Sequence, residues 1–135
     1  MNQQHPDAVA AEALARIPVG APMAYVDASV KDGIAAIGIV YVRAHPDPDL
    51  GMTTMGAHIP DMSNANAAEC VAVASALELG AAYVVTDSQA AINLLADECE
   101  AVLLFVPGDA DVPFHRQAHE LAAEARERAE EDQHG

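Results

Sequence analysis

Basic side chains are scarce in this sequence of 135 residues. Six Lys and Arg residues stand against 21 Asp and Glu residues, which gives a formal net charge of −15. This balance argues against a protein that holds nucleic acid by a broad basic surface, because such a surface needs clustered cations to neutralise phosphates. It leaves open an enzyme whose positive charge comes from bound metal ions. We interpret the acidic charge mainly as a source of solubility.

Cysteines and long apolar runs are also rare. Two cysteines, Cys70 and Cys99, are too few for a disulfide scaffold, which favours a reducing compartment and predicts a cytoplasmic protein. No apolar run reaches the roughly 18 residues that a membrane span needs. The start, MNQQHPD, has no basic segment followed by an apolar one, so no secretory signal is predicted. Because 52% of the residues are hydrophobic, we expect one folded domain, with a monomer as the default.

Short-range patterns predict the order helix, three strands, helix, strand, helix, strand, helix. The Asp32-Gly33 pair is a hairpin signal between the first two strands, and the third strand has the glycines and threonines of a sheet edge. Three antiparallel strands followed by βαβ units predict an α/β fold with a mixed five-stranded sheet and helices on both faces. The predicted elements are 7–16, 23–30, 34–42, 50–58, 65–79, 82–86, 88–96, 102–106 and 114–131.

Three segments follow from this order. Residues 1–20 form an extension whose short helix, capped by Asp7, is predicted to be an addition to the main pattern. Residues 21–130 form the domain, and residues 131–135 are predicted to be a frayed acidic tail. On helix 65–79, one face is predicted to pack against the core; its residues are Ala68, Val71, Ala72, Ser75 and Leu79.

Three carboxylates stand where structure alone does not explain them. Asp27 interrupts an apolar strand, where an unpaired buried charge is costly. Glu69 lies in the first turn of helix 65–79, and Asp87 closes an apolar run. Each also has an ordinary interpretation: Asp27 in a turn, Glu69 in a capping box that starts at Asn66, and Asp87 as an N-cap. Their joint order along the elements favours a shared site.

Four segments resemble those of the ribonuclease H family, and together they span about Met23 to Arg128. They correspond to the family's first hairpin, its first helix, its TDSQ segment, and its last loop and helix. In this sequence they read YVDASVKDGIAAIGIVY, SNANAAECVAVASALELG, VVTDSQAAINLL and VPGDADVPFHRQAHELAAEA. The resemblance implies a ribonuclease H-like fold. It also implies an endonuclease that cuts the RNA strand of an RNA–DNA hybrid and leaves 3′-hydroxyl and 5′-phosphate ends.

The resemblance further implies four acidic residues that hold two divalent cations. Two ions can activate the attacking water and stabilise the leaving oxygen, and carboxylate oxygens select Mg²⁺ or Mn²⁺. Three positions match Asp27, Glu69 and Asp87. The fourth is His119, in the segment HELA, where the family usually has Asp. We expect His119 to be a ligand; imidazole favours Mn²⁺ or other transition ions, so the choice between the two ions stays open.

Two further residues are expected beside these ligands. His115 lies four residues before His119 on the same helix face, and its place in the family pattern implies a supporting role next to the ligands. Asp109 stands where the family often has a His after the Val-x-Gly segment, and a carboxylate there could take up a proton. A surface His and a solvated loop charge are the ordinary alternatives.

Few groups are left to hold the substrate. About fifteen residues separate Asp87 from the strand at Val102, which leaves no room for the basic helix and loop that many members of the family use. Polar side chains can contact the 2′-hydroxyls of RNA, and basic ones can contact phosphates. The candidates are Ser29, Asn64 and Asn66 for the sugar, and Lys31 and Arg116 for phosphate.

The sequence therefore predicts a metal-dependent endoribonuclease of ribonuclease H type. One alternative is a binding module without catalysis, which the acidic surface, the missing basic segment and His119 favour. The joint presence of Asp27, Glu69 and Asp87 argues against that module. Another alternative is a related nuclease that acts on structured DNA or on an RNA duplex, since fold does not decide substrate.

Overall fold

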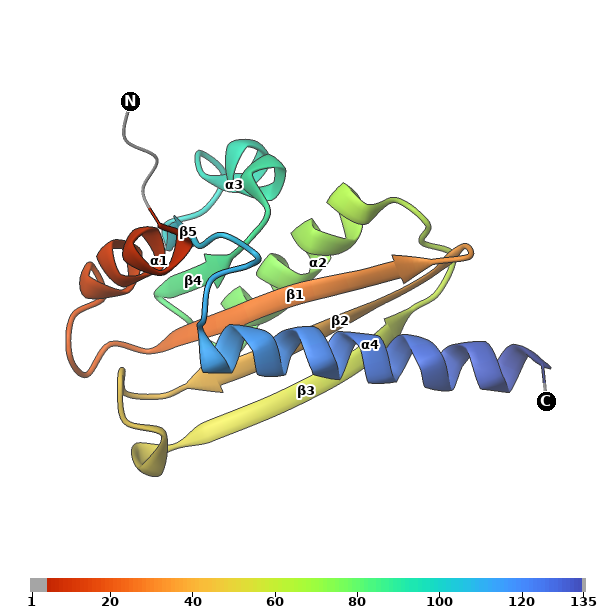
Figure 1. Ribbon diagram of the computed structural model, residues 1–135, viewed down its shortest axis with the longest axis horizontal. Coiled ribbons are helices and arrows are strands. Elements are labelled where there is room, and N and C mark those ends of the chain that lie inside the picture. The colour runs from red at the N-terminus through yellow and green to blue at the C-terminus, as the bar shows by residue number, and fades with distance from the viewer. Residues whose placement is uncertain (1–4, 135) are drawn as a thin grey trace.

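A five-stranded mixed sheet organises the computed structural model, which describes residues 5–134 (Figure 1). The strand order is β3-β2-β1-β4-β5. The pairs β1–β2 and β2–β3 are antiparallel, whereas β1–β4 and β4–β5 are parallel, so the predicted mixed sheet is confirmed. The strands are β1 (Met23–Lys31), β2 (Ile34–Val42), β3 (Met52–Ile59), β4 (Tyr83–Thr86) and β5 (Val102–Phe105).

The first hairpin forms where the sequence predicts it. Asp32 and Gly33 both have positive φ angles, 54° and 78°, which is the conformation that a two-residue turn between twisted strands requires. β3 lies at the sheet edge, as predicted, and follows a short 3-10 turn, Pro48–Leu50.

Two pairs of helices cover the two faces of the sheet. The helices are α1 (Pro6–Ala15), α2 (Ala65–Glu78), α3 (Gln89–Leu95) and α4 (Pro113–His134). α1 and α4 share one hydrophobic core with the side chains of β1, β2 and β4 that point to their face. α2 packs on the opposite face with α3 beside it. Figure 1 shows α4 crossing β1, β2 and β3 along much of its length.

Glycines let α4 approach the sheet closely. A Cβ atom at Gly38 on β2 would collide with the backbone carbonyl of Ala118. A Cβ atom at Gly56 on β3 would come within 2.7 Å of the carbonyl oxygen of Leu121. Gly38 is also the cross-strand partner of Asp27, so the first half of α4 lies directly over the strand position that carries the buried carboxylate.

The buried face of α2 differs from the predicted one. Ala68 and Ala72 are buried as predicted, but Glu69, Val73 and Ala76 complete that face. Leu79 is 40% exposed, and Ser75 is only partly buried. Because α2 is rich in alanine on every side, its periodicity does not single out one face.

The ends of the chain also differ from the prediction. His5, not Asp7, caps α1, and Ala10, Ala13 and Ile17 pack into the core, so this helix is an integral part of the fold. α4 continues to His134 through most of the segment that was predicted to be a frayed tail. Residues 1–4 and Gly135 lie outside the described residues, and the domain boundaries stay a prediction. In the described part of the chain, no helix combines the length and the apolar character needed to cross a membrane.

Candidate active site

Asp27 occupies the middle of β1 and points to the face that α4 covers. It follows Met23 and Tyr25 at alternate positions of the strand, and both of those side chains belong to the core under α4. Asp27 is only 4% exposed, which excludes the interpretation as a turn residue. Its Oδ2 accepts a hydrogen bond from Nδ1 of His119 at 2.7 Å. A carboxylate in this position needs such partners, because burial without them is costly.

Asp87 follows the last residue of β4, at the carboxyl end of a parallel strand. It is not the N-cap of α3, because Ser88 fills that position and its Oγ accepts from the N–H of Ala91 at 3.1 Å. The Asp87 side chain is thus free of any capping role. The loop after β5 comes very close to it: a Cβ atom on Gly108 would lie 2.9 Å from Asp87 Oδ2.

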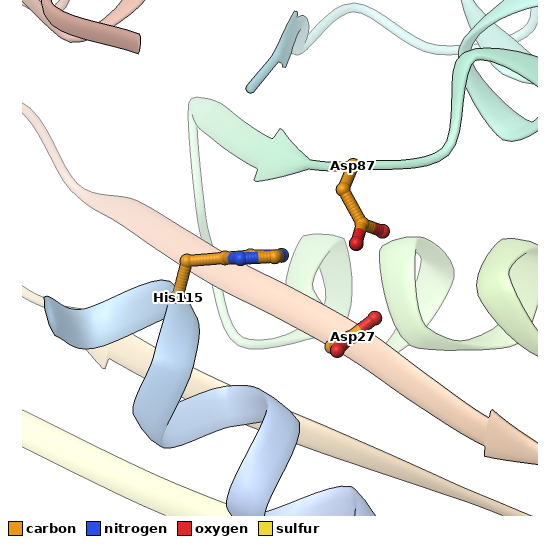
Figure 2. A group of neighbouring side chains, drawn as sticks. All are labelled: Asp27, Asp87 and His115. Atoms are coloured by element: carbon orange, nitrogen blue, oxygen red, sulfur yellow. The ribbon is translucent and has the colours of Figure 1, made fainter. Parts of the chain in front are cut away.

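His115 completes a group with the two aspartates. It lies in the first turn of α4, is 5% exposed, and its Nε2 has no hydrogen-bond partner among the described residues. One ligand atom from each of Asp27, Asp87 and His115 lies within 4.8 Å of the others. Figure 2 shows the three side chains reaching toward the same space from β1, from the end of β4 and from α4.

Glu69 reaches the site from the other face of the sheet. α2 begins two residues earlier than the predicted capping box requires. Asn64 is the N-cap and accepts from the N–H of Ala67 at 3.0 Å, so Glu69 does not cap the helix. Its Oε1 instead accepts from the N–H of Ala28 on β1 at 3.1 Å. Its Oε2 is buried and has no hydrogen-bond partner in the part of the chain that the structure describes.

The electrostatics of these carboxylates favour a cation. Burial, together with the negative charges of Asp27 and Asp87, raises the pKa of Glu69 to about 9. Burial and the charge of Asp27 also raise the pKa of Asp87, although the two histidines act in the opposite direction. Carboxylates that repel one another in a buried site must take up protons or a cation.

An open cleft of about 530 Å³ gives access to this group. Its lining includes two of the predicted residues from the last loop and helix, Asp109 and Arg116, and both are exposed to solvent. The ring of His119 also lines the cleft and is 62% exposed. Nη1 of Arg116 donates to Oδ1 of Asp111 at 3.1 Å.

The predicted substrate contacts lie at several places. Ser29 follows Asp27 on the same face of β1, and its Oγ accepts from Nε of the buried Arg126 at 3.0 Å. Asn64 and Asn66 are exposed at the start of α2. Lys31 is exposed at the last position of β1.

His115 and Arg126 are more deeply buried than the sequence predicts. His115, predicted only to support the ligands, groups with both aspartates, whereas His119 contacts Asp27 from the exposed side. The spacing of four residues indicates that the two histidines share one face of α4. How closely α4 packs on the sheet decides which of them is buried. The sequence does not predict the burial of Arg126, because an arginine late in an amphipathic helix normally faces solvent.

Comparison with known structures identifies the architecture. The chain superposes on LC11-RNase H1, isolated from compost by a metagenomic approach, with a TM-score of 0.58 and 19% identity, covering 82% of this chain and 98% of that one. LC11-RNase H1 in complex with an RNA/DNA hybrid gives a TM-score of 0.57 and 21% identity, covering 80% and 98%. The fold is that of ribonuclease H.

This similarity establishes the ribonuclease H-like fold that the sequence motifs predicted. No protein-family model and no curated protein sequence matches the chain. At 19% and 21% identity, the shared fold does not by itself carry over an activity. Any activity depends on the side chains of the candidate site.

Proposed function

We propose that this protein is a metal-dependent endonuclease that hydrolyses the RNA strand of RNA–DNA hybrids. One observation carries the proposal: Asp27, Asp87 and His115 converge to within 4.8 Å in an open cleft of a ribonuclease H-like fold. The hybrid is the proposed substrate because a protein of similar fold has been solved in complex with an RNA/DNA hybrid.

The residues of the site fit divalent cations. Glu69 Oε2 and His115 Nε2 are buried without hydrogen-bond partners among the described residues, and each such atom is costly unless it has a ligand. Carboxylates with an imidazole suit Mg²⁺ or Mn²⁺, with the imidazole favouring Mn²⁺. Two ions would supply water activation and charge neutralisation at the scissile phosphate. In our proposal Asp27, Asp87 and Glu69 hold them, with His115 and the predicted ligand His119.

The protein's own groups have separate tasks in this proposal. Asp27 is held in orientation by the hydrogen bond from His119, and Glu69 by the N–H of Ala28. The exposed ring of His119 and the carboxylate of Asp109 face the cleft, where either can exchange a proton with the solvent. Because β1, β4, α2 and α4 pack in the core, the proposed ligands stand on regular elements or, for Asp87, directly after one.

Substrate binding in this proposal relies on few direct contacts. Arg116 lines the cleft and can contact a phosphate. Ser29, Asn64 and Asn66 are proposed to contact 2′-hydroxyls, and Lys31 to contact phosphate further along the strand. With a net charge of −15, we expect weak binding that depends on divalent ions and falls with monovalent salt.

The test is cleavage of an end-labelled RNA–DNA hybrid with Mg²⁺ and Mn²⁺ in separate reactions. Asp87→Asn removes a carboxylate charge from the site, and Asp97→Asn removes an equal charge from an exposed position after α3. We expect the wild type and Asp97→Asn to cut the RNA strand, leaving 5′-phosphate ends, and Asp87→Asn to lose at least a hundredfold in rate, on the order of the effect of removing one catalytic electrostatic group.

The same assay separates the alternatives. RNA duplex and DNA duplex substrates are tested beside the hybrid. Preferential cutting of either duplex would identify that duplex, and not the hybrid, as the substrate. No cutting of any substrate with either ion, at low and high salt, would leave a binding module with a ribonuclease H-like fold. The cytoplasmic location and the monomeric state stay predictions.

A further inference from the structure

Among the described residues, one long-range hydrogen bond connects the N-terminal helix to the loop that lines the cleft. Oδ1 of Asp7, in the first turn of α1, accepts from the backbone N–H of Asp111 at 2.7 Å, across 104 residues of sequence. Asp111 belongs to the loop between β5 and α4, which lines the cleft with Gly108, Asp109 and Ala110. This contact fastens the loop to a helix that was predicted to be an addition to the fold.

Both sides of this contact are anchored in the core. On α1, Ala10 and Ala13 are buried, so the helix cannot shift without opening the core that it shares with α4. On the loop, Val112 directly after Asp111 is 4% exposed and packs in the same core. The loop between Pro107 and Val112 has few other fixed points: Ala110 N–H donates to Pro107, and Val112 N–H to Ala110.

The loop in turn contacts the positive charge of the cleft through Asp111. Among the described residues that line it, Arg116 is the one Lys or Arg side chain, and its guanidinium donates to Asp111 at 3.1 Å. A phosphate that enters the cleft would meet this guanidinium beside the two aspartates and His115. Arg116 itself stands on α4, so the loop acts on its guanidinium through this exposed ion pair with Asp111.

We propose that Asp7 is a positioning residue for the substrate: by fixing the backbone of Asp111, α1 holds the 107–112 loop and Arg116 in the arrangement that binds a nucleic-acid phosphate. This inference rests on the proposed function only for the identity of the ligand. The proposed metal-binding side chains stand on β1, on α2, directly after β4 and on α4, outside this loop. Asp109 belongs to the same loop, so loss of the contact should weaken substrate binding strongly and slow the chemical step to a smaller extent.

Three variants of α1 isolate the hydrogen bond. Asp7→Ala removes the acceptor, whereas Asp7→Asn keeps an acceptor oxygen at the same position and loses the charge. Glu12→Ala removes one negative charge from an exposed position of the same helix and serves as the matched control. Because Asp7→Asn and Asp7→Ala both lose the favourable interaction of an acidic residue with the helix N-terminus, the difference between them reports the contact with Asp111.

The first measurement is hydrogen–deuterium exchange of the segment 107–112, which needs no nuclease activity. We expect exchange in Asp7→Ala to be roughly five- to tenfold faster than in the wild type, the effect of one hydrogen bond on a local opening. Asp7→Asn and Glu12→Ala should stay near the wild type. Equal exchange in Asp7→Ala and Glu12→Ala would overturn the proposal that Asp7 fixes the loop.

The second measurement is the affinity for a labelled hybrid by fluorescence anisotropy, together with KM and kcat where cleavage occurs. Asp7→Ala should weaken binding and raise KM about three- to tenfold, with a smaller fall in kcat, and Asp7→Asn should restore the wild-type values. A fall in kcat alone, or no change in affinity, would overturn the positioning role. If the wild type binds the hybrid but does not cut it, the proposed nuclease fails while the effect of Asp7 on binding still decides this inference. A wild type that does not bind the hybrid overturns the substrate part of the inference.

Discussion

Glu69 is predicted to make the metal-free protein less stable as the pH rises. Its pKa is raised from 4.5 to about 9 by burial and by the charges of Asp27 and Asp87. Between pH 4.5 and about pH 9, the native state therefore keeps a proton that the unfolded state has released. Where the native state holds more protons, the free energy of unfolding falls with increasing pH. The stabilisation is fully present below pH 4.5 and is lost as the pH rises through about 9.

The size of this effect follows from the proton count. One extra proton on the native state lowers the free energy of unfolding by about 1.4 kcal/mol per pH unit. This amounts to about 4 kcal/mol between pH 5 and pH 8 if Glu69 stays protonated in the native state. Glu69→Gln removes this cost, because the amide is neutral at every pH and keeps an acceptor for the N–H of Ala28. In EDTA, the variant should be up to about 4 kcal/mol more stable than the wild type at pH 8 and nearly equal to it at pH 4.5.

The assay is urea unfolding followed by far-UV circular dichroism at pH 5, 6.5 and 8 in EDTA at constant salt. The quantity that matters is the difference between Glu69→Gln and the wild type, because repulsion within a chain of net charge −15 affects both alike. Glu78→Gln, at the exposed far end of α2, is the matched control. Some slope should remain in Glu69→Gln, since the pKa of Asp87 is raised as well. Parallel stability curves for Glu69→Gln and the wild type would refute the reasoning.

Two other predictions follow from the site and from the packing of α4. A hundredfold excess of Mn²⁺ over its Kd should stabilise the wild type by about 2.7 kcal/mol and raise Tm by roughly 10 °C, whereas Asp87→Asn should respond far less in the same thermal-shift assay. Gly38→Ala should lower the free energy of unfolding by about 3 kcal/mol, because the new methyl group collides with the carbonyl of Ala118; unchanged urea unfolding would contradict the close approach of α4.

The candidate site was recognisable from the sequence because its chemistry conflicts with its surroundings. A carboxylate inside an apolar strand marks Asp27, and the order of Asp27, Glu69 and Asp87 along the elements matches the ribonuclease H pattern. Asp27 and Asp87 do lie together with a histidine. Which histidine it is depends on how deeply α4 settles on Gly38, and that depth is a property of two segments far apart in the chain.

Local chemistry, by itself, determined the elements of this protein. Alternating and continuous apolar runs predicted all five strands, and Asp32-Gly33 predicted the first hairpin, because strand period and turn conformation are decided by neighbouring residues. Tertiary packing alone decided the buried face of α2, the place of α1 in the core, and the bond from Asp7 to Asp111. An alanine-rich helix offers nearly the same surface on every side, and a contact across 104 residues leaves no trace in local periodicity. Such features exist only once the sheet has brought the distant segments together.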